Sequence, residues 1–219
     1  MYDKNLEYLR KTALDFGIKL SRSHLDHFSI YLEELVQWNR RINLTGLSEI
    51  ERMVSELFLD SLTPTPFLPC EGRMLDVGSG AGFPGMVIKI YCPRLKTHLL
   101  EPNSKKRSFL KQIIRQLNLD DISVINGRIE MDGDRLHPDG YHIITSRALA
   151  GIDRIIAWCS PFLSRDGLIV GFLGSKVEDE LNRARQSVED NSLSLEKLFP
   201  YSLPGKSSKR NIVILKKKK

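Results

Sequence analysis

The sequence predicts an α/β fold, a mostly parallel sheet preceded by a helical extension, on three observations. Residues 1–66 carry apolar side chains at helical spacing. From residue 67 onward, short apolar runs alternate with helical segments, as parallel strands covered on both faces do. The last two strands are joined by the short loop PGKSSKR, which favours an antiparallel final pair. We therefore expect an N-terminal helical extension over 1–66 and a sheet domain over 67–219.

Three helices are expected in the extension. The segment DKNLEYLRKTALDF, residues 3–16, places Leu6, Leu9 and Ala13 on one face. Ser21 or Ser23 can cap a second, longer helix, because serine hydroxyls accept hydrogen bonds from the free N–H groups of a first turn. A third helix is expected to begin at Ser48, since Glu51 three residues later would complete a capping box. The prolines of TPTPFLP then end the helical region.

Strands and helices alternate in the sheet domain. The expected strands cover residues 73–77, 96–101, 122–126, 141–146 and 167–173, with a last strand in NIVILKKKK. The expected helices lie near 83–91, 103–117, 151–163 and 176–190. Five alternating units followed by a strand–loop–strand ending predict a seven-stranded sheet.

Composition fits one substantial globular chain of 219 residues, 41% of them apolar. The N-terminus MYDKNLEYLRK is charged, and no stretch approaches the roughly 18 apolar residues of a membrane span. Cys70, Cys92 and Cys159 show no paired spacing, which suits a reducing compartment. His24 and His27 have no apparent third ligand, so no metal site is expected. We expect a cytoplasmic monomer without membrane or metal partners.

The formal net charge of +6 rests mainly on the terminal run Lys216–Lys219. Removing these four of 33 basic residues leaves 29 against 27 acidic ones, so charge alone is weak evidence for a polyanion partner. The tail can be a solubilising end or a nonspecific phosphate contact. The basic residues within 105–115 can be a solvated helix face or an RNA contact. Both alternatives stay open on the sequence.

A glycine-rich loop in LDVGSGAGFPG, residues 75–85, is the main candidate for binding chemistry. Gly80, Gly82 and Gly85 satisfy the spacing G-x-G-x-x-G, and Glu101 ends the next expected strand, where an acid can bind ribose hydroxyls. This pattern suits a dinucleotide or another adenosine-bearing cofactor. A glycine turn without any ligand is the remaining alternative.

Two residues of the loop favour S-adenosylmethionine over a dinucleotide. Asp76 would repel a pyrophosphate but can help to hold an ammonium group, and S-adenosylmethionine carries an amino acid where NAD carries phosphates. Pro84 removes an N–H group that a pyrophosphate would need. A dinucleotide-dependent oxidoreductase is therefore the less favoured enzyme.

Motifs over nearly the whole chain resemble the bacterial ribosomal RNA small subunit methyltransferase G family, also called glucose-inhibited division protein B. The motifs are WNRRINLT (38–45), LDS (59–61), DVGSGAGFPG (76–85), KKRSFL (105–110), GRIE (127–130), SRA (146–148) and KRNIVILKK (209–217). The resemblance implies a class I (Rossmann-like) fold and methyl transfer from S-adenosyl-L-methionine, with S-adenosyl-L-homocysteine as product. The implied target is N7 of one guanosine in small-subunit (16S) rRNA, presented as free rRNA, an assembly intermediate or the 30S subunit.

The resemblance also implies a set of cofactor contacts. By position they fall on Gly78, Phe83, Ile129, Glu130 and Arg147. The residue chemistry described above adds three further contacts to this cofactor-binding set. These are Asp76, Gly80 and Glu101.

One position departs from the family pattern, because Leu57 stands before the LDS run where relatives often carry histidine. No catalytic residue is assigned, since guanine N7 carries an unprotonated lone pair at neutral pH and needs only to be positioned. A non-catalytic rRNA-binding or assembly protein that keeps the cofactor pocket is the second alternative.

Overall fold

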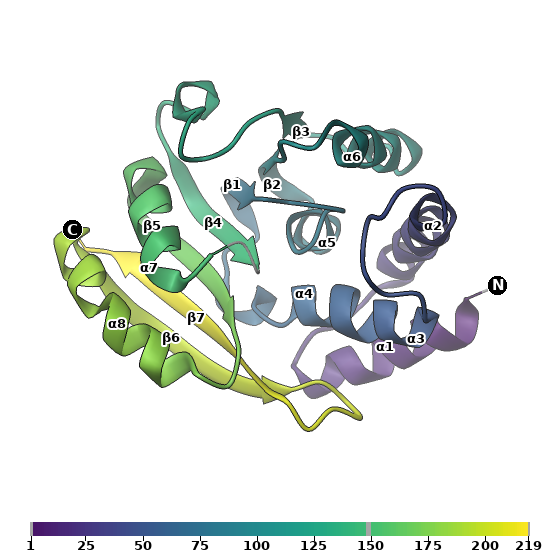
Figure 1. The fold of residues 1–219 in the computed structure, drawn as a ribbon. Coiled ribbons are helices and arrows are strands. Elements are labelled where there is room, and N and C mark those ends of the chain that lie inside the picture. Colours follow the sequence, from purple (N-terminus) through teal and green to yellow (C-terminus); the bar gives the residue numbers. More distant parts are fainter. Residues whose placement is uncertain (1, 148–149, 219) are drawn as a thin grey trace.

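Seven strands form one sheet in the order β3-β2-β1-β4-β5-β7-β6 (Figure 1). The computed structural model describes residues 2–147 and 150–218. The strands are β1 Glu71–Val77, β2 Arg94–Leu100, β3 Ile122–Ile125, β4 Tyr141–Arg147, β5 Leu163–Leu173, β6 Leu193–Ser202 and β7 Lys209–Lys217. The first five pair in parallel, and β7 runs antiparallel to β5 and β6. The predicted mostly parallel, seven-stranded α/β sheet is confirmed.

Helices cover both faces of this sheet (Figure 1). Four of them belong to the sheet domain: α5 Gly85–Tyr91, α6 Ser104–Gln116, α7 Ile152–Cys159 and α8 Val177–Asp190. Met74 of β1 joins a buried cluster with α5, α6 and the N-terminal helices, whereas its neighbour Leu75 joins a second cluster with α7 and α8. Successive side chains of a strand point to opposite faces, so one short apolar run supplies both clusters.

The N-terminal segment is helical but less regular than expected. It contains α1 Asp3–Asp15, α2 Arg22–Asn39 and a continuous helical stretch made of α3 Ile50–Met53, a π-helix Val54–Leu59 and α4 Asp60–Leu62. Ser21 caps α2, because its hydroxyl accepts a hydrogen bond from the N–H of His24. Short 3₁₀ turns lie at Thr65–Phe67, Gly133–Arg135 and Ser160–Phe162.

The predicted capping box at Ser48 is wrong. Helix α3 begins at Ile50, its N-cap is Glu49, and no side chain caps it. The reason lies in the preceding loop, which the Asn39 side chain closes: its oxygen accepts from the N–H groups of Leu44 and Thr45, both at 2.9 Å. Ser48 therefore still belongs to a loop whose course is set by Asn39, nine residues earlier.

The N-terminal helices and the sheet share a core. Tyr31 of α2 stacks on Phe83 of the glycine loop with ring centroids 5.3 Å apart, and Phe58 meets both rings edge-on. Phe109 of α6 packs against the same tyrosine. This aromatic cluster fixes the extension against the loop where the cofactor is expected.

The expectation of unpaired cysteines is wrong for two of the three, because Cys70 and Cys92 form a disulfide. Cys70 directly precedes β1, and Cys92 lies just before β2. These strands are parallel neighbours whose first residues, Glu71 and Arg94, are in register. Two cysteines that are 22 positions apart in sequence thereby meet at the amino ends of β1 and β2. Cys159 is free, and burial raises the pKa of its thiol to about 12.

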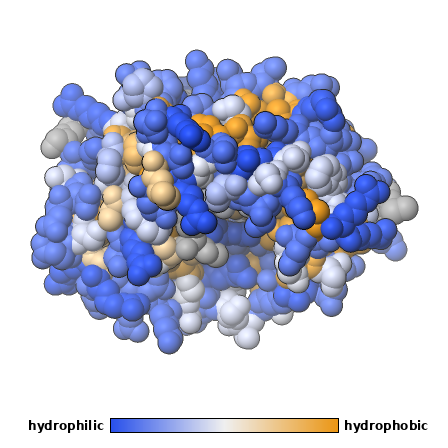
Figure 2. Space-filling model, turned by 45° about the horizontal axis from the view of Figure 1, so that its top comes forward, coloured by the Kyte–Doolittle hydropathy of each residue, from blue (hydrophilic) through white to orange (hydrophobic). Residues whose placement is uncertain are grey.

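The surface is mainly polar in the view of Figure 2, where hydrophobic residues form separate groups among hydrophilic ones. Within the described residues, no helix combines the length and apolar character needed to cross a membrane.

Candidate functional site

The glycine loop follows β1 at the carboxyl edge of the sheet. β1 lies between β2 and β4, where the strand order reverses, and such switch points are where open α/β sheets bind ligands. Gly78, Gly80 and Gly82 all have positive φ, at 71°, 58° and 96°. A side chain on Gly82 would also collide with the Tyr31 hydroxyl. Only glycine fits this path without strain.

Most N–H groups of the loop, all but that of Ala81 within residues 78–83, are used within the protein. Gly78 and Ser79 donate to the carbonyl of Leu100, Gly80 donates to Glu101, and Gly82 and Phe83 donate to the carbonyl of Ser79. Among the described residues, nothing donates to the carbonyl groups of Gly78 and Gly80. The loop therefore leaves a ligand two carbonyl acceptors but, at Ala81, only one N–H donor, whereas a pyrophosphate requires several donors.

Asp76, the last but one residue of β1, is fully buried. Its Oδ1 accepts from Thr145 Oγ1 at 2.7 Å and its Oδ2 from the N–H of Gly85 at 3.1 Å. Burial raises the pKa of this carboxyl to about 6, against the opposing effect of these hydrogen bonds. Asp76 ties the far end of the glycine loop to β1 and β4, so both oxygens are already committed within the protein.

Glu101 follows β2 and links the glycine loop to α6. Its Oε2 accepts from the N–H of Gly80 and its Oε1 from the N–H of Asn103, both at 2.8 Å. Asn103 in turn caps α6. A carboxylate has about four lone-pair sites, so two remain for a ligand's hydroxyl groups.

The other predicted contacts fall into two groups. Phe83 is buried, and the Arg147 guanidinium carbon lies 5.9 Å from the centre of its ring. Ile129 is buried in the turn after β3, in the same cluster as Val77, whereas Glu130 is exposed. In the described part of the chain, no hydrogen bond joins this turn to the other predicted contacts. Ala148 of the SRA motif lies outside the described residues.

Sequence reasoning missed a buried ionic cluster that holds Arg147. Asp60, whose side chain is 1% exposed, pairs through Oδ2 with Arg147 at 3.2 Å and with Arg210 at 3.1 Å. Its Oδ1 accepts from the Tyr201 hydroxyl at 2.6 Å. Burial raises the pKa of Tyr201, so this hydroxyl remains a donor. Three distant segments thus meet at one carboxylate.

Glu56, one helical turn before Asp60, completes the cluster. Its main-chain carbonyl accepts from Arg147 at 3.0 Å. Its carboxylate pairs with Arg52 at 2.8 Å and with Lys206 at 3.2 Å. The hydrogen bond from Arg52 is the largest of the effects that lower the pKa of Glu56, so this carboxyl is ionised at neutral pH.

The comparisons with known proteins decide the family. The model of the family described as rRNA small subunit methyltransferase G matches residues 24–213. This chain belongs to that family. The resemblance predicted from the sequence motifs is confirmed, and with it the prediction of a methyltransferase.

Curated members of the rRNA small subunit methyltransferase G family match over nearly their whole length. The protein of Acetivibrio thermocellus is 33% identical over 99% of this chain and 91% of its own. That of Roseiflexus sp. (strain RS-1) is 34% identical over 96% of this chain and 91% of its own. Among solved structures, TYW2 of M. jannaschii in complex with AdoMet superposes with a TM-score of 0.55, at 16% identity over 67% of this chain and 68% of that one. At this identity the likeness shows the fold alone, which is that of class I methyltransferases.

The family motifs contain the one signal that could have revealed the ionic cluster. LDS and KRN include Asp60 and Arg210, but nothing in the sequence places them together. Their burial depends on how the π-helical stretch and β7 pack, which no local pattern reports.

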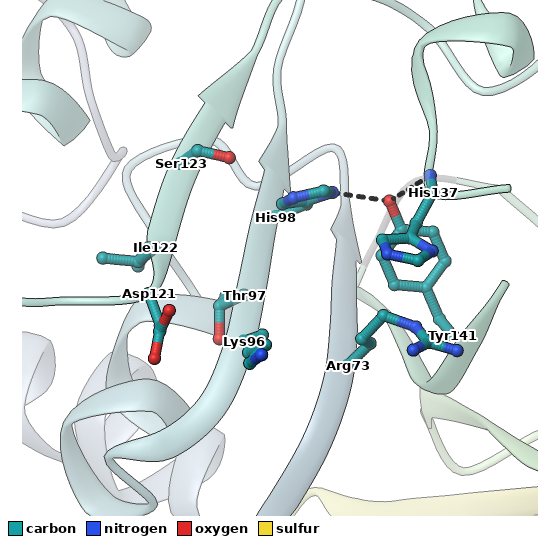
Figure 3. A pocket seen from close by; sticks show the side chains of 9 residues that line it. All are labelled: Arg73, Lys96, Thr97, His98, Asp121, Ile122, Ser123, His137 and Tyr141. Atoms are coloured by element: carbon teal, nitrogen blue, oxygen red, sulfur yellow. Dashed lines mark hydrogen bonds between the residues drawn. The ribbon is translucent and has the colours of Figure 1, made fainter. Parts of the chain in front are cut away.

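Two cavities lie at opposite ends of the strands. One, of about 560 Å³, opens at the carboxyl ends of β4 and β5 and contains Arg147 in its wall. The other, of about 390 Å³, lies toward the amino ends of β1, β2 and β3 (Figure 3). There His98 Nδ1 and the Tyr141 hydroxyl are 2.6 Å apart, and Arg73 donates to the carbonyl of Gly140. None of the predicted cofactor contacts lines this second cavity.

Proposed function

We propose that the protein transfers a methyl group from S-adenosyl-L-methionine to N7 of a guanosine in small-subunit (16S) rRNA. Family membership supports the reaction class. The observation that carries the cofactor assignment is the hydrogen bonding of the glycine loop. Five of the six N–H groups of residues 78–83 are satisfied within the protein, all but that of Ala81, while the carbonyls of Gly78 and Gly80 remain available, which suits an ammonium group better than a pyrophosphate.

The residues present fit such a cofactor on the carboxyl edge of β1 and β2. The main chain at Gly78 would accept the methionine part, since glycine there leaves the backbone uncovered. Glu101 would use its two remaining lone-pair sites for the ribose hydroxyls. Two hydrogen bonds hold the loop in shape: the N–H of Gly85 donates to Asp76, and the N–H of Gly80 donates to Glu101.

The rest of the site would close around the adenine and the reacting end. The turn at Ile129 and Glu130 would take the adenine edge, beside the end of β3. Phe83 would wall the pocket, and Arg147 would stand by the methyl group, fixed by Asp60. These placements follow the family pattern, and the chain's own geometry supports them.

The chemistry asks little of the protein beyond placement. When bound, S-adenosyl-L-methionine supplies an activated methyl group, and S-adenosyl-L-homocysteine is the product. The lone pair of N7 forms the new N–C bond while the S–C bond breaks, so the positive charge passes from sulfur to the base. No proton has to be removed before attack. The protein therefore aligns two reactants, for which large effective molarities are available.

The partner that we propose is small-subunit rRNA, free or within an assembly intermediate or the 30S subunit. The protein would act as a monomer in the cytoplasm, where ribosomes are built. Residues 67–219 would carry the methyltransferase site, and the helices of 1–66 would brace it through the core shared with α5 and α6.

Methyl transfer to RNA tests this function directly. Purified protein and labelled S-adenosyl-L-methionine are incubated with naked small-subunit rRNA and with 30S subunits, both from a strain lacking the protein. We expect label at one guanosine, with mass mapping placing it at N7. Absence of label on both substrates would favour the non-catalytic rRNA-binding alternative.

Cofactor binding gives the first prediction for a variant. Glu101→Ala should weaken S-adenosyl-L-methionine binding by about 1.5–3 kcal/mol, because hydrogen bonds to a charged group are lost. Isothermal calorimetry measures the affinity, with NAD as the competing ligand. Glu71→Ala, an exposed carboxylate at the other end of β1, serves as the control. Wild-type affinity in Glu101→Ala would remove Glu101 from the site.

A further inference from the structure

The cavity of about 560 Å³ at the carboxyl ends of β4 and β5 is separate from the proposed cofactor contacts. It shares only Arg147 with them, and its other walls come from the π-helical stretch, the end of β5 and the β6–β7 hairpin. Its volume lies within the usual range for small-molecule sites. It adjoins the position where the methyl group would be presented.

Cations outnumber carboxylates in the lining of this cavity. Arg147, Lys209 and Arg210 line it together with Glu56 and Asp60. Two further cations pair with Glu56 from just outside the lining. These are Arg52 and Lys206. The three lining cations against two carboxylates, with Arg52 and Lys206 paired to Glu56 behind them, favour an anionic ligand.

The carboxylates hold cations in place instead of offering acceptors to a ligand. Both oxygens of Asp60 are occupied, and Oδ2 alone pairs with Arg147 and Arg210. Lys209 differs, because it is exposed and no ion pair or side-chain hydrogen bond is formed by it among the described residues. Half-buried Phe172 adds a flat apolar wall. Fixed cations, one available lysine and an aromatic ring match the phosphate and the base of a nucleotide.

We propose that this cavity receives the target nucleotide of the RNA, an inference that rests on the proposed function. Lys209 and Arg210 bind its phosphate, and the base lies against Phe172 with its reactive edge toward Arg147. Asp60 is a positioning residue: its shared Oδ2 sets Arg210, on the RNA side, at a fixed distance from Arg147, on the cofactor side.

Salt-dependent RNA binding tests the phosphate contacts. Unmethylated small-subunit rRNA is titrated with wild-type protein, Lys209→Ala and Arg210→Gln at several salt concentrations. Each variant should lower affinity about tenfold and reduce the slope of log Kd against log salt by about one, as loss of one phosphate contact does. Affinity for S-adenosyl-L-methionine should stay at the wild-type value. Lys96→Ala, which removes the same charge beside the amino-end cavity of Figure 3, is the control and should change neither.

A double-mutant cycle tests the role of Asp60. Asp60→Asn keeps the shape of the side chain and removes its charge. If Asp60 acts on RNA through Arg210, the RNA affinity of the double variant Asp60→Asn/Arg210→Gln should equal that of the single variant with the lower affinity. Asp60→Asn alone should also lower kcat by misplacing Arg147, whereas Lys209→Ala should raise KM for RNA at unchanged kcat. Thermal unfolding of each variant confirms that it is folded.

The outcomes separate this inference from the proposed function. Wild-type RNA affinity in both Lys209→Ala and Arg210→Gln would overturn the nucleotide cavity, even if the enzyme methylates rRNA. If these two variants lost affinity for S-adenosyl-L-methionine and kept their affinity for RNA, the cavity would belong to the cofactor. That result would also overturn the proposal that the cavity receives a nucleotide. If the losses of RNA affinity in Asp60→Asn and Arg210→Gln multiply in the double variant, the two residues act independently and the role of Asp60 is overturned. A wild-type protein that binds rRNA here but methylates nothing would contradict the proposed function alone.

Discussion

Asp76 is the residue whose chemistry differs most from that of an ordinary aspartate. Its carboxyl is enclosed by β1, β4 and the glycine loop, and burial raises its pKa from 3.8 to about 6 although Thr145 and Gly85 donate to it. The folded protein therefore binds this proton more tightly than the unfolded chain does. The associated stability is complete below about pH 4 and is lost as the pH rises through about 6.

Asp76→Asn should remove this pH dependence. Relative to the variant, the free energy of unfolding of the wild type should fall by up to about 3 kcal/mol between pH 4 and pH 7, since one pKa unit corresponds to about 1.4 kcal/mol. Urea unfolding at pH 4, 5.5 and 7 measures the difference. Asp15→Asn, at the exposed end of α1, gives the baseline. Parallel pH profiles for Asp76→Asn and wild type would show that Asp76 titrates normally.

At the scale of the element, strand β7 separates basic residues that the sequence presents as one group. Lys209 and Arg210 line the cavity at its amino end. At the other end, Lys216 pairs with Asp166 and Lys217 donates to main-chain carbonyls of the 3₁₀ turn and β5. Seven residues of extended chain span about 23 Å, so the two ends cannot contact the same phosphate. Lys219 lies outside the described residues.

The tail should therefore contribute less to RNA binding than the amino end of β7. The double variant Lys216→Gln/Lys218→Gln should leave the salt slope of rRNA binding and the methylated guanosine unchanged, because both lysines lie far from the cavity. The slope is measured as for Lys209→Ala. A decrease as large as that of Lys209→Ala would show that the bound RNA extends over the whole strand. This variant is preferable to a truncation, since Lys217 pairs with Leu193 of β6.

For the whole molecule, the sheet has a proposed cofactor half at β1–β3 and a proposed RNA half at β4–β7, and Arg147 lies between them. No histidine or cysteine lines the carboxyl-edge cavity in the described part of the chain. His98 and His137 lie at the opposite end of the strands (Figure 3). Burial keeps the Cys159 thiol protonated at neutral pH. Among the described residues, neither histidine nor cysteine is therefore placed to act as a general base there, and the carboxylates of Glu56 and Asp60 are held in ion pairs.

The single-turnover rate at saturating substrates should accordingly be nearly flat from about pH 6.5 to 9, because N7 is already unprotonated and no base has to ionise. Arg147→Ala should lower this rate through misplaced reactants and add no new pH dependence. Rapid-quench measurements with labelled methyl donor give the profile. A rate that rises about tenfold per pH unit would reveal a proton acceptor and disprove the base-free mechanism.

The sequence by itself determined the features that local patterns encode. Alternating apolar runs predicted that β1–β5 run parallel, the short loop before Lys209 predicted the antiparallel end, and Ser21 was one of the two candidate caps of α2. The glycine loop was also readable, because positive φ angles demand glycine. Each of these signals lies within a few residues of the structure it specifies.

Only the tertiary structure decided which distant residues meet. Asp60 joins Arg147 and Arg210 although 87 and 150 positions separate them along the chain. The Cys70–Cys92 pairing depends on the register of β1 with β2, and the late start of α3 on the amide of Asn39. The direction of the loop N–H groups, which distinguishes the two cofactor classes, depends on the carbonyl of Leu100 in the neighbouring strand. Burial and pairing of polar groups are properties of the packed chain, so no local pattern in the sequence records them.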